Sequence, residues 1–142
     1  MALIVIGTDG SPNSAAALDW AVNEAKLRDA TLKVVHTWHE TYVGTYPYSV
    51  ADTSAVLEKA ATEVLASIAD GAEAALGRPV ERVVRYGATV PSLGEEAAEA
   101  DLLGVGTRGH GGFTGLLLGS VSASLAHHTP CPLVIVPSSP DE

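Results

Sequence analysis

The sequence predicts an α/β protein in which a five-stranded parallel sheet is doubly wound, with helices on both faces. Short apolar runs alternate with longer helical patterns along the chain. The intervals between successive strands are long enough for the crossovers that parallel pairing requires. The 142 residues suit one ordinary domain, so we expect residues 1–142 to form a single domain.

The first half of the chain contains two predicted strands and two predicted helices. The apolar residues 3–6 predict a strand buried on both faces, and Ser11-Pro12 suits the start of the next helix. Residues 31–38 form a second β-rich run, followed by a loop with three tyrosines. The spacing of apolar residues then predicts a long amphipathic helix from about residue 51 to residue 76, which Gly77 and Pro79 end.

The second half supplies three further strands. Residues 80–86 alternate and carry three charges, as expected of an edge strand, and residues 90–100 predict a short helix. Residues 101–106 form another buried strand, a helix is expected from about Ser120 to His127, and residues 133–136 form the last strand. The strand character favours the order 3-2-1-4-5. Ligands then bind at the carboxyl ends of the first and fourth strands, where the winding reverses.

Composition and charge exclude several classes of protein. Seventeen acidic residues against eight Lys and Arg give a net charge of −9, so we expect no nucleic-acid partner. The apolar run near the N-terminus is too short for a signal peptide or a membrane span, which favours a cytoplasmic protein that does not bind membranes. The single cysteine, Cys131, is expected to be a small buried apolar residue.

The stretch from Gly104 to Ser122 contains seven glycines and suggests a phosphate site. Its start, GVGTRG, fits G-x-G-x-x-G, but that fingerprint belongs to the first strand–helix turn and needs an acidic residue about twenty positions later. A different spacing fits better: Gly106-x-x-Gly109 ends a strand and, nine residues later, Gly119-Ser120 opens a helix. Glycines and a helix N-terminus present main-chain N–H groups to an anion. Gly104 is then a strand residue with a packing role.

This spacing resembles the ATP-binding branch of the universal stress protein family, whose motif is G-x-x-G, nine residues, then G-[ST]. The resemblance covers essentially the whole chain, including the strand that ends at Asp9, the segment ADLLGVGTRG and the closing TPCPLVIVP. It implies a Rossmann-like, adenine-nucleotide-binding fold. It also implies that the cofactors are ATP and a divalent cation, Mg²⁺ or Mn²⁺, bound together with the nucleotide.

The resemblance implies roles for individual residues. Asp9 would approach the ribose and help hold the metal, Thr8 and Gly10 would line the same pocket, and the backbone around Thr37 would contact adenine. The phosphate contacts would come from the glycine motif and the helix that follows it, with two basic groups nearby: Gly106, Arg108, Gly109, His110, Gly119, Ser120, Val121 and Ser122. From the residues alone, Asp9 and Ser120 are also suited to capping the helices that follow them.

Three classes of function remain open at this point. The first is a nucleotide-dependent switch in the stress response, acting on a protein partner and hydrolysing ATP slowly at most, because the loop offers no lysine and no evident base. The second is a nucleotide hydrolase or adenylyl-transferring enzyme on the same sheet. The third is a scaffold whose pocket stays empty or takes AMP or cyclic AMP. We assign no catalytic residue.

The last strand predicts a homodimer. In the order 3-2-1-4-5 the strand Leu133–Val136 lies at an edge, yet all of its residues are apolar. An exposed apolar edge promotes association, so we expect a second copy to pair there, unless the C-terminal tail shields the strand.

The histidines favour structural roles. His36 and His39 would point to opposite faces of a strand, so we expect no transition-metal site there. His127 and His128 lie at the end of a predicted helix, where their charge suits the helix dipole.

Overall fold

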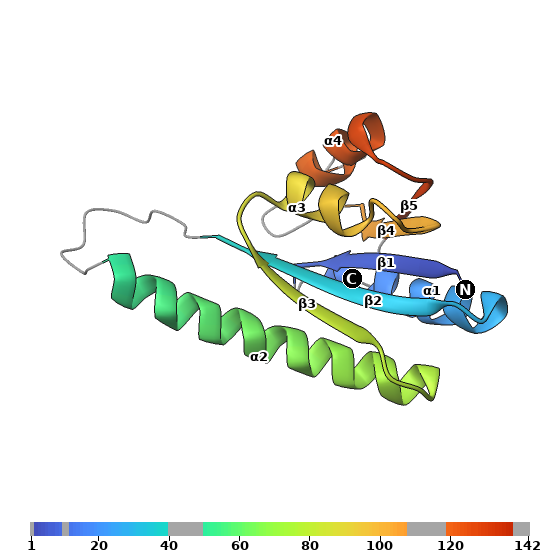
Figure 1. The fold of residues 1–142 in the computed structure, drawn as a ribbon, viewed down its shortest axis with the longest axis horizontal. Helices are drawn as coiled ribbons and strands as arrows, with labels where there is room; N and C mark the ends of the chain where they lie inside the picture. Colours follow the sequence, from blue (N-terminus) through green and yellow to red (C-terminus); the bar gives the residue numbers. More distant parts are fainter. Residues whose placement is uncertain (1, 10–11, 40–49, 108–118, 138–142) are drawn as a thin grey trace.

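The described residues form a five-stranded parallel sheet with two helices on each face (Figure 1). The computed structural model describes residues 2–9, 12–39, 50–107 and 119–137. The strand order β3-β2-β1-β4-β5 confirms the predicted topology. The elements in chain order are β1 (Leu3–Thr8), α1 (Pro12–Arg28), β2 (Thr31–Trp38), α2 (Val50–Leu76), β3 (Glu81–Tyr86), α3 (Thr89–Glu96), β4 (Leu102–Gly106), α4 (Ser120–His128) and β5 (Leu133–Val136).

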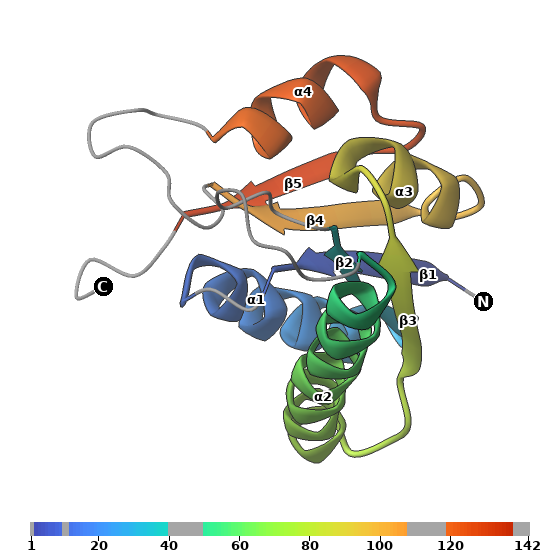
Figure 2. The same cartoon turned by 90° about the vertical axis from the view of Figure 1, so that its left-hand side faces the viewer.

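The sheet separates two apolar cores. Helices α1 and α2 cover one face, and α3 and α4 cover the other (Figure 2). Ile4 and Ile6 of β1 belong to the core under α1 and α2, whereas Val5 belongs to the core under α3 and α4. This alternation follows from the two-residue period of a strand. The central strands need apolar residues on both faces, which explains their continuous apolar runs.

Helix α3 is shorter than its sequence pattern predicts. It ends at Glu96, and the chain then makes tight turns in which Ala98 N–H donates to the Glu95 carbonyl (3.3 Å) and Ala100 N–H to the Ala97 carbonyl (3.0 Å). These turns bring Asp101 to the start of the sheet, where its N–H donates to the Leu3 carbonyl at 2.9 Å. The expected helix end at residue 100 was therefore wrong. The Ala- and Glu-rich sequence after Glu96 is also compatible with a longer helix, so its composition does not reveal the turns.

Cys131 is partly exposed, which corrects the expectation of a buried residue. It packs against the core under α3 and α4 from the turn before β5. This partial burial raises the pKa of its thiol. The two flanking prolines place it in the turn that enters the last strand, at the margin of the core rather than inside it.

Two strand glycines are required by close packing. A Cβ atom on Gly104 would lie 3.3 Å from Ile6 Cδ1 and 3.6 Å from Trp20 Cζ3, which is consistent with the predicted packing role. A Cβ atom on Gly7 would lie 2.8 and 2.9 Å from the two terminal carbons of Leu93. Helix α3 therefore sits directly on β1 at Gly7.

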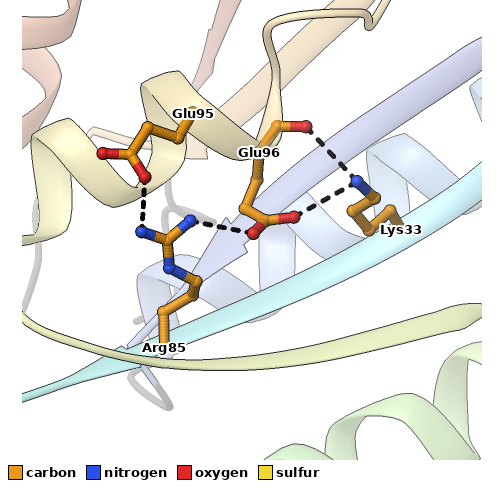
Figure 3. A network of polar contacts seen from close by, with 4 residues as sticks. All are labelled: Lys33, Arg85, Glu95 and Glu96. Carbon is orange, nitrogen blue, oxygen red and sulfur yellow. Dashed lines mark hydrogen bonds and ion pairs between the residues drawn. The ribbon is translucent and has the colours of Figure 1, made fainter.

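The C-terminal end of α3 is tied to the sheet by four charged residues, which we term the α3 ion network: Lys33, Arg85, Glu95 and Glu96 (Figure 3). Glu96 accepts hydrogen bonds from Lys33 of β2 (3.2 Å) and Arg85 of β3 (2.9 Å), and Arg85 also donates to Glu95 at 2.6 Å. Desolvation alone would raise the pKa of Glu96, but the hydrogen bonds from Arg85 and Lys33 outweigh it and lower that pKa.

Strand β5 occupies the edge of the sheet next to β4, and its four residues are all partly exposed. The prediction of an apolar edge strand is therefore confirmed. Among the elements that the structure describes, no helix is long and apolar enough to cross a membrane.

Candidate functional site

The predicted site residues within the described part of the chain lie at the carboxyl ends of β1, β2 and β4 and at the start of α4. Because all five strands are parallel, these ends share one edge of the sheet. Strand β1 lies between β2 and β4, with Thr8 opposite His36 and Ile6 opposite Gly104 in the two registers. The order thus brings Thr8 and Asp9 between the predicted adenine contact on β2 and the predicted phosphate contacts on β4.

The start of α4 returns directly to the end of β4. Gly119 N–H donates a hydrogen bond of 2.6 Å to the Thr107 carbonyl, and Thr107 N–H donates to the Val136 carbonyl of β5 at 3.1 Å. Gly119 is the N-cap of α4, with φ −75° and ψ 169°, and no side chain of the described residues caps this helix. Ser120 is therefore the first helical residue, and its interpretation as the N-cap is wrong. The first-turn N–H groups of Ser120, Val121 and Ser122 have no partner within the helix, as at any helix start.

The hydroxyl of Ser122 holds this junction together. It is buried and lies 3.1 Å from the Gly106 carbonyl and 2.8 Å from the Thr107 carbonyl, to which it donates. Since a hydroxyl has one proton, Ser122 can offer an anion its main-chain N–H but not its side chain in this arrangement. Ser120, by contrast, is exposed.

Asp9 and Ser14 form a reciprocal pair at the entry to α1. The Ser14 hydroxyl donates to Asp9 Oδ1 at 2.8 Å, and Asp9 N–H donates to the Ser14 oxygen at 3.1 Å. This pairing orients the carboxylate at the end of β1. Ser14 is not among the predicted site residues, although its position in the first turn of a helix that begins at Pro12 is a signal for such a contact.

Thr37 lies one residue beyond the part of β2 that pairs with β1. Its side chain is buried, and its hydroxyl lies 3.0 Å from the hydroxyl of Thr89, the first residue of α3. No pattern in the sequence connects these two residues, which are 52 positions apart. The contact places the N-terminus of α3 beside the predicted adenine contact.

His36 is a buried histidine at the same edge of the sheet. The residue is 6% exposed, and its Nδ1 donates a 3.0 Å hydrogen bond to the Thr8 carbonyl, so Nε2 carries no proton in the neutral ring. Burial lowers the pKa of His36, although the Thr8 carbonyl and the Asp9 charge oppose this shift. The neutral imidazole therefore links β2 to the carbonyl that precedes Asp9.

Acidification is expected to destabilise the protein through His36. The unfolded chain takes up a proton near the ordinary pKa of about 6.5, whereas the folded chain does so only at lower pH. The His36 contribution should therefore fall as pH drops below about 6.5, by at most about 1.4 kcal/mol per pH unit. His36→Asn retains an N–H donor but cannot titrate. Urea unfolding at pH 7.5, 6.5 and 5.5 should show a smaller acid loss in this variant, and an equal loss in both proteins would contradict the assignment.

Four predicted site residues, Gly10, Arg108, Gly109 and His110, lie outside the described residues, as do the three tyrosines of the loop before α2. Among the residues that the structure does describe, no cluster of three or more His, Cys, Asp or Glu side chains could hold a metal ion.

The other histidines lie in different surroundings. His36 is buried whereas His39 is exposed. At the end of α4, His128 Nδ1 lies 3.0 Å from the Ser124 carbonyl, in agreement with the predicted role at a helix C-terminus.

Comparison with known proteins identifies the family. The model of the Universal stress protein family matches residues 1–137. The chain belongs to this family. Universal stress protein Rv2005c of Mycobacterium tuberculosis is 36% identical over 136 residues, which are 96% of this chain and 45% of that protein. This universal stress protein chain thus spans about half the length of the curated relatives that it matches.

Solved structures support the same assignment. A universal stress protein crystallised in complex with cAMP is 31% identical, with a TM-score of 0.72 over 97% of this chain and 98% of that one. Universal stress protein UspA from Lactobacillus plantarum has a TM-score of 0.81 over 95% of this chain and 97% of that one. At 20% identity, the second likeness establishes the fold of this universal stress protein chain.

Proposed function

We propose that this chain binds ATP across the carboxyl edge of its sheet and acts as a nucleotide-dependent switch in the cytoplasmic stress response. The observation that carries the proposal is the junction of β4 and α4. There the start of a helix is held against the end of a strand by the Gly119 N–H and the Ser122 hydroxyl. This leaves main-chain N–H groups and the positive end of the α4 dipole for the phosphates.

The residues present fit a nucleotide at this edge. No acidic residue lies in the first turn of α4, so nothing in that turn repels a phosphate. Neighbouring strands are about 4.8 Å apart, so the ends of β2 and β4, with β1 between them, are separated by roughly 10 Å. A nucleotide can span such a distance with its base near Thr37, its ribose near Asp9 and its phosphates near Gly106 and Gly119.

A divalent cation fits as part of the nucleotide complex rather than as a separate protein site. Asp9 contributes one carboxylate at the end of β1, and its orientation is fixed by Ser14. Mg²⁺ is usually bound by one or two carboxylates together with phosphate oxygens and water. In the proposed complex, Mg²⁺ or Mn²⁺ neutralises part of the phosphate charge. The chain supplies Asp9 as a ligand and the α4 amides as donors.

The nucleotide itself can be identified directly. Freshly purified protein is denatured, and the released small molecules are separated by chromatography and identified by mass spectrometry. Isothermal titration of the nucleotide-free protein with ATP, ADP, AMP and cyclic AMP then ranks the affinities. We expect ATP, with or without Mg²⁺, to bind most tightly. A protein that binds none of the four nucleotides would refute the proposal.

Cyclic AMP is the second candidate ligand, because the solved universal stress protein with 31% identity was crystallised with cAMP. Cyclic AMP has one phosphate and would engage fewer of the α4 amides than a triphosphate does. Tighter binding of cyclic AMP than of ATP in the same titration would replace ATP by cyclic AMP in the proposed function.

A single-turnover assay tests for enzymatic activity. ATP turnover faster than about 1 s⁻¹ would favour an enzyme over a switch.

We also propose that a second copy of the chain pairs with the outer edge of β5, the edge that does not pair with β4. The four residues of this strand are apolar and partly exposed, which favours burial against a like surface. Sedimentation at micromolar concentration is expected to give twice the monomer mass. Val134→Lys places a charge on the strand and is expected to shift the protein towards the monomer, whereas a monomeric wild type would contradict the proposal.

A further inference from the structure

Three hydroxyl-bearing residues lie in the first turn of α3 and at the end of β2 beside it, and we term them the α3 hydroxyl cluster: Thr37, Thr89 and Ser92. The hydroxyls of Thr37 and Thr89 are 3.0 Å apart. Thr89 and Ser92 are three residues apart on α3 and therefore share one face of the helix. The Ser92 oxygen lies 3.9 Å from the position of a Cβ atom on Gly87, beside the turn that leads into the helix.

Ser92 is a buried residue whose hydroxyl has no hydrogen bond to the described part of the chain. It is 4% exposed, and none of the residues that the structure describes donates to its oxygen or accepts from it. Leaving a buried polar group unpaired is costly, so a hydroxyl that has no partner among the described residues is a candidate for a hydrogen bond to an ordered water or a bound molecule. Side chains in a helix lean towards its N-terminus, so the Ser92 side chain leans towards the start of α3.

We propose that Thr89 and Ser92 contact the base of the bound nucleotide and help to select it. This inference rests on the proposed function and adds residues of α3 to the predicted contact at Thr37. When Thr37 and Thr89 are bonded to each other, the pair retains one O–H donor and free acceptor capacity. Adenine presents an amino donor beside a ring-nitrogen acceptor, which such hydroxyls can satisfy together.

Charge and position favour the base over the phosphates as the group bound here. The cluster carries three neutral hydroxyls and lies at the end of β2, with β1 between it and the β4–α4 junction. The start of α3 has no side-chain cap, and Pro91 in its first turn has no N–H to offer. An uncharged ligand edge suits this set better than a phosphate, whose donors are supplied by α4.

The position of Thr89 is fixed from the other end of its helix. The α3 ion network ties Glu95 and Glu96 to β2 and β3 (Figure 3). Leu93 packs directly over Gly7 of β1. Both ends of α3 and its middle are thus held on the sheet. A hydroxyl carried by such a helix keeps a defined position relative to Thr37, as base selection requires.

The test compares two probes, ATP and inorganic tripolyphosphate, by isothermal titration. Ser92→Ala and Thr89→Val each remove one hydroxyl and are expected to raise the Kd for ATP about three- to tenfold, the worth of one neutral hydrogen bond. The Kd for tripolyphosphate should not change. Thr89→Ser keeps the hydroxyl and should bind ATP within about twofold of the wild type.

Thermal unfolding of the free proteins separates base contact from packing. Because the Ser92 hydroxyl has no described partner, Ser92→Ala should not lower the melting temperature even though it weakens ATP binding. If the wild type binds ATP and both hydroxyl-removing variants bind it equally well, the inference is overturned and the proposed function stands. Equal loss of ATP and tripolyphosphate binding also overturns it. A wild type that binds no ATP overturns both.

Discussion

Gly119→Val is expected to raise the Kd for ATP about a hundredfold or more while the protein still folds. Gly119 caps α4 with φ −75° and ψ 169°, an extended conformation that valine adopts without strain. The added side chain would, however, stand beside the first-turn N–H groups of α4. Losing two charge-assisted hydrogen bonds of about 1.5–3 kcal/mol each accounts for at least that change in Kd.

The matched control separates main-chain from side-chain recognition. Ser120→Ala removes an exposed hydroxyl but keeps every N–H group of the first turn, so we expect it to change the ATP Kd by about tenfold at most. Titration calorimetry gives both Kd values, and circular dichroism with thermal unfolding checks the fold. Unchanged ATP affinity in Gly119→Val would remove the phosphate site from the start of α4.

The fold was predictable because its signals are local or follow from general rules of sheet topology. The apolar runs of β1 and β4 and the charged alternation of β3 were enough to order the strands. Helix ends were less predictable, since the residues after Glu96 have helical propensity but fold into turns that return the chain to β4. The lack of a side chain at Gly7 makes room for Leu93, which lies 86 positions away and leaves no trace in the local pattern.

The meeting of β4 and α4 was predictable because glycines mark it in the sequence. The spacing of Gly106 and Gly119 predicted that the end of β4 and the start of α4 contribute to one site, and these residues do lie together. Pairs of small polar side chains carried no such signal. The contacts of Asp9 with Ser14, His36 with the Thr8 carbonyl, and Thr37 with Thr89 join different elements through common residue types.

Gly7→Ala is expected to destabilise the protein by about 1–3 kcal/mol, the usual cost of overpacking a core. The new Cβ atom would lie 2.8 Å from Leu93 Cδ1, closer than such atoms approach in proteins. Leu93 is 2% exposed and cannot swing into solvent, so either its side chain leaves its rotamer or α3 moves away from β1. Urea unfolding monitored by circular dichroism measures the loss.

Gly71→Ala is the matched control, because it adds the same methyl group inside α2, where a Cβ atom would meet nothing within 4 Å. It should stabilise the protein by about 0.5–1 kcal/mol, since alanine favours the helix over glycine. If Gly7→Ala leaves the free energy of unfolding unchanged, the Leu93 side chain moves aside at little cost. If α3 moves instead, Thr89 moves with it, and Gly7→Ala should weaken ATP binding while leaving tripolyphosphate binding unchanged. The same substitution thus reports on both the packing of α3 and its contact with the base.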